Sequence, residues 1–460
     1  MRNLFKKLLA SCMAATFLFT LNLHVAAAET VGITLRFDSN DESEAILERA
    51  YSDMMPRVVA DMQHSFAIVD GNLWVWGFDN SGTFDSFDFH YSTSPILVMD
   101  NIASVYPNLW LSNFVIRYDR SLWAWGRDGQ GTGALGDGGF GRTRYYPIHI
   151  MDDVIDFSVS FSHAAAVRSD GSLWTWGSNT FGMLGDGTTV FRYYPTKIME
   201  NVASVYIAGL QTMTIKNDGS LWVWGRSTKF PDGREASDPV PEYWLSPRHI
   251  MDNVASISSA HSLFNTMIVQ NDGSLWAWGS NEFGQIGDGT TIERLNPVRV
   301  MDNVKAVSIQ GWHDSANAFA IKNDGSLWFW GTKISGEREM IAEHHYPVHI
   351  MDNVASVYSN GLNFMAHLND GSLWAWGYNR FGQVGDGTTT HRNYPVHILD
   401  NVATFSLGRG HAFAVLTDGS IWAWGANPWG ILGDGTTLNR YVPVQVVFPE
   451  EHGRPLFNFD

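Results

Sequence analysis

The sequence contains almost no cysteine and only one long apolar run. Cys12 is its single cysteine among 460 residues, so no intramolecular disulfide can form and the core has to hold the fold. The apolar run covers residues 8–23, and no later segment approaches the roughly 20 residues that a membrane-spanning helix needs. We therefore expect no membrane span in the folded part of the chain.

Positive charge is also scarce. There are 30 Lys and Arg residues against 47 Asp and Glu residues, which gives a formal net charge of −17 at pH 7. An anionic chain without a run of Lys or Arg opposes binding to phosphate backbones, so we expect no nucleic acid partner. Apolar residues make up 45% of the chain and aromatic residues 13%, which indicates a folded globular protein.

The first 28 residues have the three parts of a secretory signal peptide. One Arg and two Lys precede the apolar run 8–23, and residues 26–28 form an Ala-Ala-Ala cleavage site. Removal of this segment takes away three positive charges and leaves a formal charge of −20. We predict cleavage near Ala28 and a protein that is secreted or held at the cell envelope. Lipidation at Cys12 and retention as a membrane span are the weaker alternatives.

A repeated phrase runs through the rest of the chain, an Asp-Gly turn followed by Leu-Trp-x-Trp-Gly. Eight copies, some of them degenerate, recur every 46 to 54 residues, which is typical of an array of stacked units. Residues 29–56 form a lead-in, predicted as a short strand and helix, and residues 450–460 form a tail. The units between them are residues 57–101, 102–152, 153–201, 202–253, 254–303, 304–353, 354–401 and 402–449.

The third unit illustrates the secondary structure that each repeat predicts. Four short strand-like runs are separated by turn residues, and Asp170-Gly171 is placed for a tight hairpin in which glycine supplies a positive φ. The third run is apolar on both faces, as a sheet packed between two neighbouring sheets requires. We therefore predict an all-β fold, a single β-propeller of four-stranded antiparallel blades. Eight blades are favoured over seven with an outlying unit.

Sixteen of the 20 tryptophans belong to this motif, and we interpret them as the packing between blades. They are Trp74, Trp76, Trp123, Trp125, Trp174, Trp176, Trp222, Trp224, Trp276, Trp278, Trp328, Trp330, Trp374, Trp376, Trp422 and Trp424.

A polar residue recurs just before the second strand of every unit. His, Asn and Gln replace one another there, so a shared hydrogen-bonding role fits better than metal or acid–base chemistry. We predict that the side chain satisfies a buried backbone group near the turn. The eight residues are His64, Asn113, His163, Gln211, Asn265, Asn317, Asn363 and His411.

Five units carry a Gly-Asp-Gly segment between the third and fourth runs. Each such loop offers one carboxylate, too few for calcium, and no Lys follows as in a phosphate-binding loop. We interpret the aspartate as a turn residue that accepts hydrogen bonds from its own backbone. The aspartates are Asp137, Asp186, Asp288, Asp386 and Asp434.

The order Asp-Gly-Ser-Leu-Trp-Ala-Trp-Gly, Asn-x-x-Gly-Gln-x-Gly-Asp-Gly-Thr-Thr, Arg and Pro-Val resembles the regulator of chromosome condensation repeat. Residues 272–298 and 370–396 carry it almost without a gap, and degenerate copies cover about 57–449. The resemblance implies a propeller, most often seven-bladed, that binds other proteins through its loop faces. The eukaryotic namesake promotes nucleotide exchange on a small GTPase and binds chromatin. An export signal and an acidic chain fit neither activity, so exported bacterial members are the nearer comparison.

The pattern breaks in the loops between the third and fourth runs of units 1, 4 and 6. In a meander these loops share one mouth of the ring with the turns between the first and second runs. The four tryptophans outside the motif all fall on that mouth, as an interaction surface rich in aromatic and Arg residues requires. The predicted binding residues are Trp110, Trp244, Trp312, Trp429, Phe230, Tyr243, Arg234 and Arg338.

These observations favour a non-enzymatic protein that binds a protein partner through irregular loops on one face. We expect no cofactor, no metal, no catalytic residues and a monomer; a metal site at His344-His345 is a weaker alternative. A carbohydrate-binding module, or an enzyme acting on polysaccharide or cell wall with a loop-built site, is the alternative function. No nucleophile elbow and no His-Glu-x-x-His motif is present in the sequence to support an enzyme.

Overall fold

The computed structural model describes residues 55–61, 63–79, 90–108, 112–128, 131–226, 243–260, 265–312, 315–334, 340–449 and 455–457. The predicted signal peptide and nearly all of the lead-in lie outside these residues. The described chain forms eight four-stranded antiparallel sheets, and every sheet consists of four strands that are consecutive in the sequence. The prediction of eight blades is confirmed.

The strands are short and follow one another as meanders. Blades 1 to 4 comprise β1 (Arg57–Ala60), β2 (His64–Val69), β3 (Asn72–Asp79) and β4 (His90–Met99); β5 (Ile102–Asn108), β6 (Ser112–Arg117), β7 (Leu122–Arg127) and β8 (Thr143–Met151); β9 (Val154–Val159), β10 (His163–Arg168), β11 (Leu173–Gly177) and β12 (Arg192–Met199); β13 (Val202–Ala208), β14 (Gln211–Lys216), β15 (Leu221–Arg226) and β16 (Tyr243–Met251).

The second half of the chain repeats this arrangement. Blades 5 to 8 comprise β17 (Val254–Ala260), β18 (Asn265–Gln270), β19 (Leu275–Gly279) and β20 (Arg294–Met301); β21 (Val304–Trp312), β22 (Ser315–Lys322), β23 (Leu327–Ile334) and β24 (Met340–Met351); β25 (Val354–Ser359), β26 (Asn363–Leu368), β27 (Leu373–Gly377) and β28 (Arg392–Leu399); β29 (Val402–Leu407), β30 (His411–Leu416), β31 (Ile421–Gly425), the 3-10 turn η2 (Pro428–Gly430) and β32 (Arg440–Gln445).

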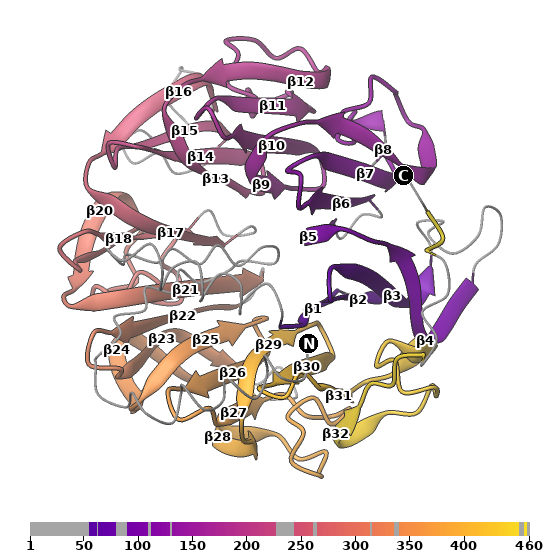
Figure 1. Ribbon diagram of the computed structural model, residues 1–460. Helices are drawn as coiled ribbons and strands as arrows, with labels where there is room; N and C mark the ends of the chain where they lie inside the picture. The colour runs from indigo at the N-terminus through magenta and orange to yellow at the C-terminus, as the bar shows by residue number, and fades with distance from the viewer. Residues whose placement is uncertain are drawn as a thin grey trace, which may run out of the picture.

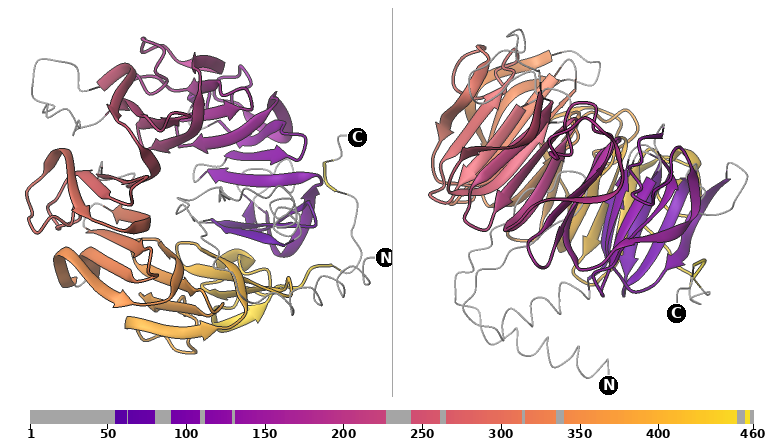
Figure 2. Two further views of the ribbon diagram at one scale, coloured as in Figure 1. Left: turned by 60° about the vertical axis from the view of Figure 1, so that its left-hand side comes forward. Right: turned by 90° about the horizontal axis from the view of Figure 1, so that it is seen from above.

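The blades stand around a ring, with the first strand of each blade nearest the centre and the fourth on the outside (Figure 1). The same circular arrangement is seen after rotation (Figure 2). Blade 8 adjoins blade 1, where the backbone N–H of Ala60 donates to Ser406 Oγ at 2.9 Å. The ring thus closes without any strand being shared between its first and last blades.

Motif tryptophans lie in apolar clusters that span neighbouring blades. The second tryptophan of every motif is buried, and in blade 3 Trp176 is fully enclosed. The first tryptophan of that blade, Trp174, donates its indole N–H to Ser172 Oγ at 2.9 Å, and this hydroxyl donates to Asp170. The Asp-Gly-Ser-Leu-Trp phrase is therefore a hydrogen-bonded relay that fixes the hairpin to the indole.

The hairpins between second and third strands are of two kinds. In blade 1 both turn residues, Asp70 and Gly71, have positive φ, as a two-residue primed turn requires. In blade 3 only Gly171 has a positive φ, and its N–H donates to Arg168 O. The predicted use of glycine is confirmed, but the turn in this hairpin is the longer one that ends in a left-handed glycine.

The fourth strands are the outer edges of the ring, where unpaired backbone groups invite pairing with other chains. Every one of them contains a proline, which lacks the N–H donor and blunts the edge. These residues are Pro95, Pro147, Pro195, Pro247, Pro297, Pro347, Pro395 and Pro443.

The recurrent polar residue is buried in all eight blades, and it lies at the start of the second strand, within it, whereas the sequence placed it just before the strand. Asn265 Nδ2 donates to Ser280 O at 2.5 Å, the buried backbone contact that the sequence predicts. The histidines reach further, since His163 Nε2 lies 2.9 Å from Thr212 Oγ1 in the next blade. Burial lowers the pKa of His411 to about 4, so this ring is neutral at pH 7.

Candidate functional site

The two mouths of the ring differ in what they contain. At one mouth the second-to-third hairpins meet the connections between blades, as in the 2.9 Å bond from Val202 N to Gly171 O. At the other mouth the turn before β18 meets the loop after β19 through the bond from Asn265 to Ser280. We call these the hairpin mouth and the loop mouth. The predicted placement of turns and loops on a common mouth is confirmed.

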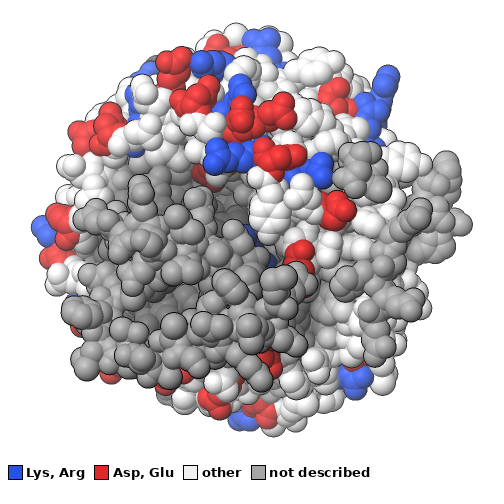
Figure 3. Space-filling view, viewed as in Figure 1, with Lys and Arg blue, Asp and Glu red and all other residues white. Residues whose placement is uncertain are grey.

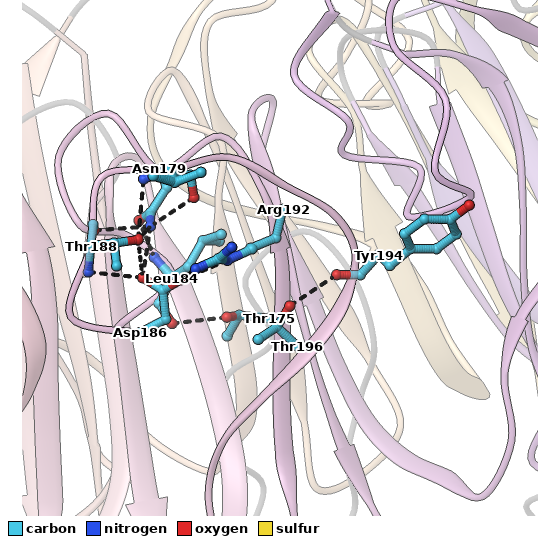
Figure 4. A network of polar contacts seen from close by, with 9 residues as sticks. Thr175, Asn179, Leu184, Asp186, Thr188, Arg192, Tyr194 and Thr196 are labelled. Carbon is cyan, nitrogen blue, oxygen red and sulfur yellow. Dashed lines mark hydrogen bonds and ion pairs between the residues drawn. The ribbon is translucent and has the colours of Figure 1, made fainter.

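The regular loops at the loop mouth are held by a dense polar network, drawn for blade 3 in Figure 4. Asp186 Oδ1 accepts from Thr188 N at 3.0 Å and from Asn179 Nδ2 at 3.0 Å, while Arg192 Nε donates to Asp186 Oδ2 at 2.7 Å. Asn179 Oδ1 also accepts from Leu184 N at 3.0 Å. The aspartate is therefore a turn residue, as predicted, and its oxygens are occupied by donors of the protein.

The network also sets the protonation of the carboxylate. Partial burial raises the pKa of Asp186, but hydrogen bonds from Thr188 and the Arg192 guanidinium outweigh burial and hold the pKa below its usual value. Asp288, Asp386 and Asp434 have the same opposing causes and the same direction of shift. In these loops an ionised aspartate is therefore paired with an arginine of the same blade.

Each regular loop also reaches across to the next blade. The motif tryptophan of that blade donates its indole N–H to a carbonyl of the loop at 2.8 to 3.1 Å, and the second glycine of Gly-Asp-Gly donates to the outer strand at 2.7 to 2.9 Å. We call these two bonds the strap. The indole donors are Trp76, Trp176, Trp224, Trp330 and Trp424, and the glycine donors are Gly435, Gly138, Gly187, Gly289 and Gly387.

The first glycine of the segment lies against the strapped indole. A Cβ on Gly185 would fall 2.6 Å from Trp224 Nε1, and its φ of +76° is itself unfavourable for other residues. Gly-Asp-Gly is therefore explained by a contact between blades, a role that the sequence analysis did not assign.

The rewritten loops of blades 1, 4 and 6 lack the Gly-Asp-Gly segment that forms the strap. Their central residues lie outside the described part of the chain, and so do Phe230, Arg234 and Arg338, together with Trp110 in the turn of blade 2. The residues that flank the loops of blades 1 and 4 are described. Both pairs of flanking residues contact an aromatic ring from the preceding blade.

The first such contact joins blades 8 and 1. Trp429 lies 5.2 Å from the ring of Phe78 and 6.1 Å from that of Tyr91, centroid to centroid, and these two residues flank the loop of blade 1. The Trp429 side chain is 50% exposed, and its backbone has a φ of +63°. Left-handed backbone is rare for a bulky residue and concentrates at functional positions.

The second contact joins blades 3 and 4. Phe181 lies under Arg226, whose guanidinium carbon is 4.6 Å from the ring centroid, and 6.0 Å from the ring of Tyr243. Arg226 and Tyr243 flank the loop of blade 4. Phe181 holds the same motif position as Trp429, the aromatic before the glycine in Asn-x-aromatic-Gly. We call the two groups the 8/1 cluster (Trp429, Phe78, Tyr91) and the 3/4 cluster (Phe181, Arg226, Tyr243).

Other predicted site residues have different environments. The ring of Trp244 is only 5% exposed, belongs to the core of blades 3 to 5 and has Arg248 5.1 Å from its centroid. Trp244 therefore offers no open aromatic surface, although Tyr243 beside it joins the 3/4 cluster. Trp312 is the last residue of β21. Sequence reasoning missed Phe78, Tyr91, Phe181 and Arg226. The repeated Asn-x-aromatic-Gly position could have indicated Phe181, and the edges of the altered loops could have indicated the other three.

The described part of the face in Figure 3 mixes acidic and basic side chains around the rim without a continuous basic area. Among the described residues, no three His, Cys, Asp or Glu side chains are grouped so as to hold a metal ion. Within the same residues, no helix has the length and apolar character needed to cross a membrane.

Fold and site together define a closed β-propeller whose loop mouth is regular in five blades and altered in three. The regulator of chromosome condensation (RCC1) repeat model matches residues 170–211, 272–311, 370–415 and 418–455, and a second model of this repeat matches residues 154–182. The RCC1 repeat is therefore present in these segments of the chain, as the resemblance predicted.

Known proteins with this repeat resemble the chain only in part or only in fold. The ultraviolet-B receptor UVR8 of Arabidopsis thaliana is 33% identical over 76 residues, which are 16% of this chain and 17% of the receptor. Human WBSCR16 has a TM-score of 0.54 at 17% identity, over 72% of this chain and 94% of that chain. Prp20p of Saccharomyces cerevisiae has a TM-score of 0.52 at 18% identity, over 71% and 85% respectively. At these identities the two structures support the fold alone.

Proposed function

We propose that this propeller is a non-enzymatic binding protein that presents the loop mouth to a protein partner. The observation that carries the proposal is the division among its loops. Five loops keep the Gly-Asp-Gly segment and hold the next blade, whereas three have another sequence without that segment. Loops that a rigid scaffold does not need for its own stability are where binding residues concentrate.

The chemistry of the two clusters supports a protein partner. Each places aromatic rings beside an altered loop, the 3/4 cluster adds a guanidinium, and aromatic and Arg residues are the commonest hot spots of protein interfaces. Among the related structures, that of Prp20p was described together with its binding to Gsp1p and histones. The net negative charge of this chain argues against nucleic acid as the partner.

Export is the second part of the proposal. The charged start, apolar run and alanine site of residues 1–28 fit a secretory signal, and a chain without further cysteine can fold equally well outside the cell. We infer that the processed chain acts as a monomer at the cell exterior, secreted or at the envelope.

Affinity capture from the native exterior tests the function. Residues 29–460 serve as bait, beside a Trp429→Ala variant and a Tyr394→Ala control, whose ring is 78% exposed on the outer strand β28, away from both clusters. We expect partner recovery to fall about tenfold with Trp429→Ala and to stay unchanged with Tyr394→Ala.

A loop exchange tests the division directly. Replacing residues 227–242 by the equivalent residues of the regular loop of blade 3, 179–190, should abolish capture while the propeller still folds. Capture that survives both changes would refute a binding site at this mouth. Binding to a glycan array, or turnover of cell-wall polysaccharide, that is lost with Trp429→Ala would favour the alternative function.

A further inference from the structure

The chain does not end where its last blade ends. Phe448, just after β32, packs edge-on against Trp74 and Trp76 of blade 1, with centroids 5.3 and 6.2 Å apart. Residues 455–457 then lie along the outside of the ring, beside blade 1 (Figure 1). The last described segment has therefore passed the whole width of blade 1.

This segment makes backbone and side-chain contacts with two blades. Leu456 N donates to Leu97 O at 3.2 Å and Phe457 N donates to Val98 O at 3.0 Å, both carbonyls on the outer strand β4. The ring of Phe457 packs against the apolar cluster that contains Val98 and meets Tyr146 of β8 edge-on at 5.8 Å. One phenylalanine therefore contacts blade 1 and blade 2 at once.

The contact lies at the interface that a regular loop of blade 1 would strap, but farther along β4. Leu97 pairs with Trp74, whereas the altered loop joins β3 and β4 beyond Asp79 and His90. A regular loop in blade 1 would strap blade 2, as the loop of blade 2 straps blade 3 through the bond from Trp176 to Ala134 O. The loop of blade 1 lacks Gly-Asp-Gly, and the C-terminal segment bridges the same two blades from the outside.

We propose that the notch between β4 and β8 is a peptide-binding site whose occupant is the chain's own C-terminal segment, residues 455–457. The site recognises an extended segment by two carbonyl acceptors on an open strand edge and by an apolar surface for one aromatic side chain. Its occupation closes the interface between blades 1 and 2. The C-terminal segment thus acts as a latch that holds blade 1 against blade 2.

Hydrogen exchange of the full processed chain tests the latch. With Phe457→Ala we expect exchange in β4 and β8 to become about tenfold faster, since the variant removes most of the apolar contact. Exchange in β28 of blade 7 should not change. Leu456→Ala is the matched control, because that side chain is 47% exposed and its backbone donor remains. Equal exchange in all three proteins would overturn the proposal.

Binding in trans tests the notch itself. A chain that ends at Pro449 should bind a synthetic peptide of residues 450–460, and the full chain should not. A peptide with Phe457→Ala should bind at least about tenfold more weakly, and one with Leu456→Ala within about twofold. No binding by the shortened chain would overturn the site. The slow hydrogen exchange of β4 could also disappear on dilution while a dimer dissociates into monomers. That result would show that the tail of a second copy occupies the notch and would refute the intramolecular latch.

Discussion

The interfaces between consecutive blades are of two kinds, and the difference lies in the loop that precedes each one. After blades 2, 3, 5, 7 and 8, a Gly-Asp-Gly loop bonds the indole and the outer strand of the next blade. After blades 1, 4 and 6, the loop has another sequence and length. Loops at equivalent positions thus fall into two groups, five that hold the next blade and three that we propose for recognition.

A ring of eight similar blades can thus include three loops that differ from the other five. A strapped loop is committed to two inter-blade bonds and a glycine contact on an indole, so its sequence is constrained. The blades after the altered loops still bury their motif tryptophans, Trp125, Trp278 and Trp376. The scaffold therefore accommodates three altered loops, and the largest consequences should follow from disturbing one of the five straps.

Two glycines of one loop give the sharpest test of the strap. A Cβ on Gly287 would lie 2.7 Å from Trp330 Nε1, whereas a Cβ on Gly289 would have nothing within 4 Å; both glycines have positive φ. Gly287→Ala combines left-handed strain with a clash in a packed interface and should destabilise by about 4 kcal/mol. Gly289→Ala has the backbone cost alone, about 1 kcal/mol. Urea unfolding of both variants checks the difference, and equal midpoints would show that the indole contact does not hold the blades.

Acid should weaken the strapped interface between blades 8 and 1. His411 is buried there, its Nε2 3.4 Å from Ser65 Oγ, and its folded pKa is about 4 against about 6.5 when unfolded. Because the folded pKa is lowered, the stability is present above pH 6.5 and is lost as pH falls toward 4. Linkage gives a loss of about 2 kcal/mol at pH 5.

A His411→Asn variant should lose the pH dependence that His411 causes. Asparagine occupies the equivalent position in blades 5 to 7. Urea midpoints at pH 7 and pH 5 measure this loss. His149→Asn is the control, since His149 is exposed on the hairpin mouth beside Asp152. An acid response that is the same in both variants would place the sensitive group elsewhere.

The sequence predicted the ring well because its evidence is periodic. Asp-Gly turns, paired tryptophans and the polar residue before the second strand each recur with a local cause, such as the relay from Trp174 through Ser172 to Asp170. The straps were not predicted because Trp224 and Met183 meet across two blades, 41 residues apart. The sequence alone also could not separate buried Trp244 from exposed Trp429, because both lie between the third and fourth strand-like runs of their units. The tail docking at β4 depends on a short segment without any repeat.

Trp429 connects the two kinds of loop, because it sits in a strapping loop and contacts Phe78 and Tyr91, which flank the altered loop of blade 1. Its φ of +63° penalises alanine but not glycine, so Trp429→Gly should be more stable than Trp429→Ala by about 1 kcal/mol. Phe381 occupies the same motif position in blade 7 and is not among the residues with positive φ. There the order should reverse, with Phe381→Gly less stable than Phe381→Ala by about 0.5–1 kcal/mol. Thermal midpoints of the four variants decide it. If alanine were more stable than glycine at both positions, Trp429 would not be held in a strained backbone.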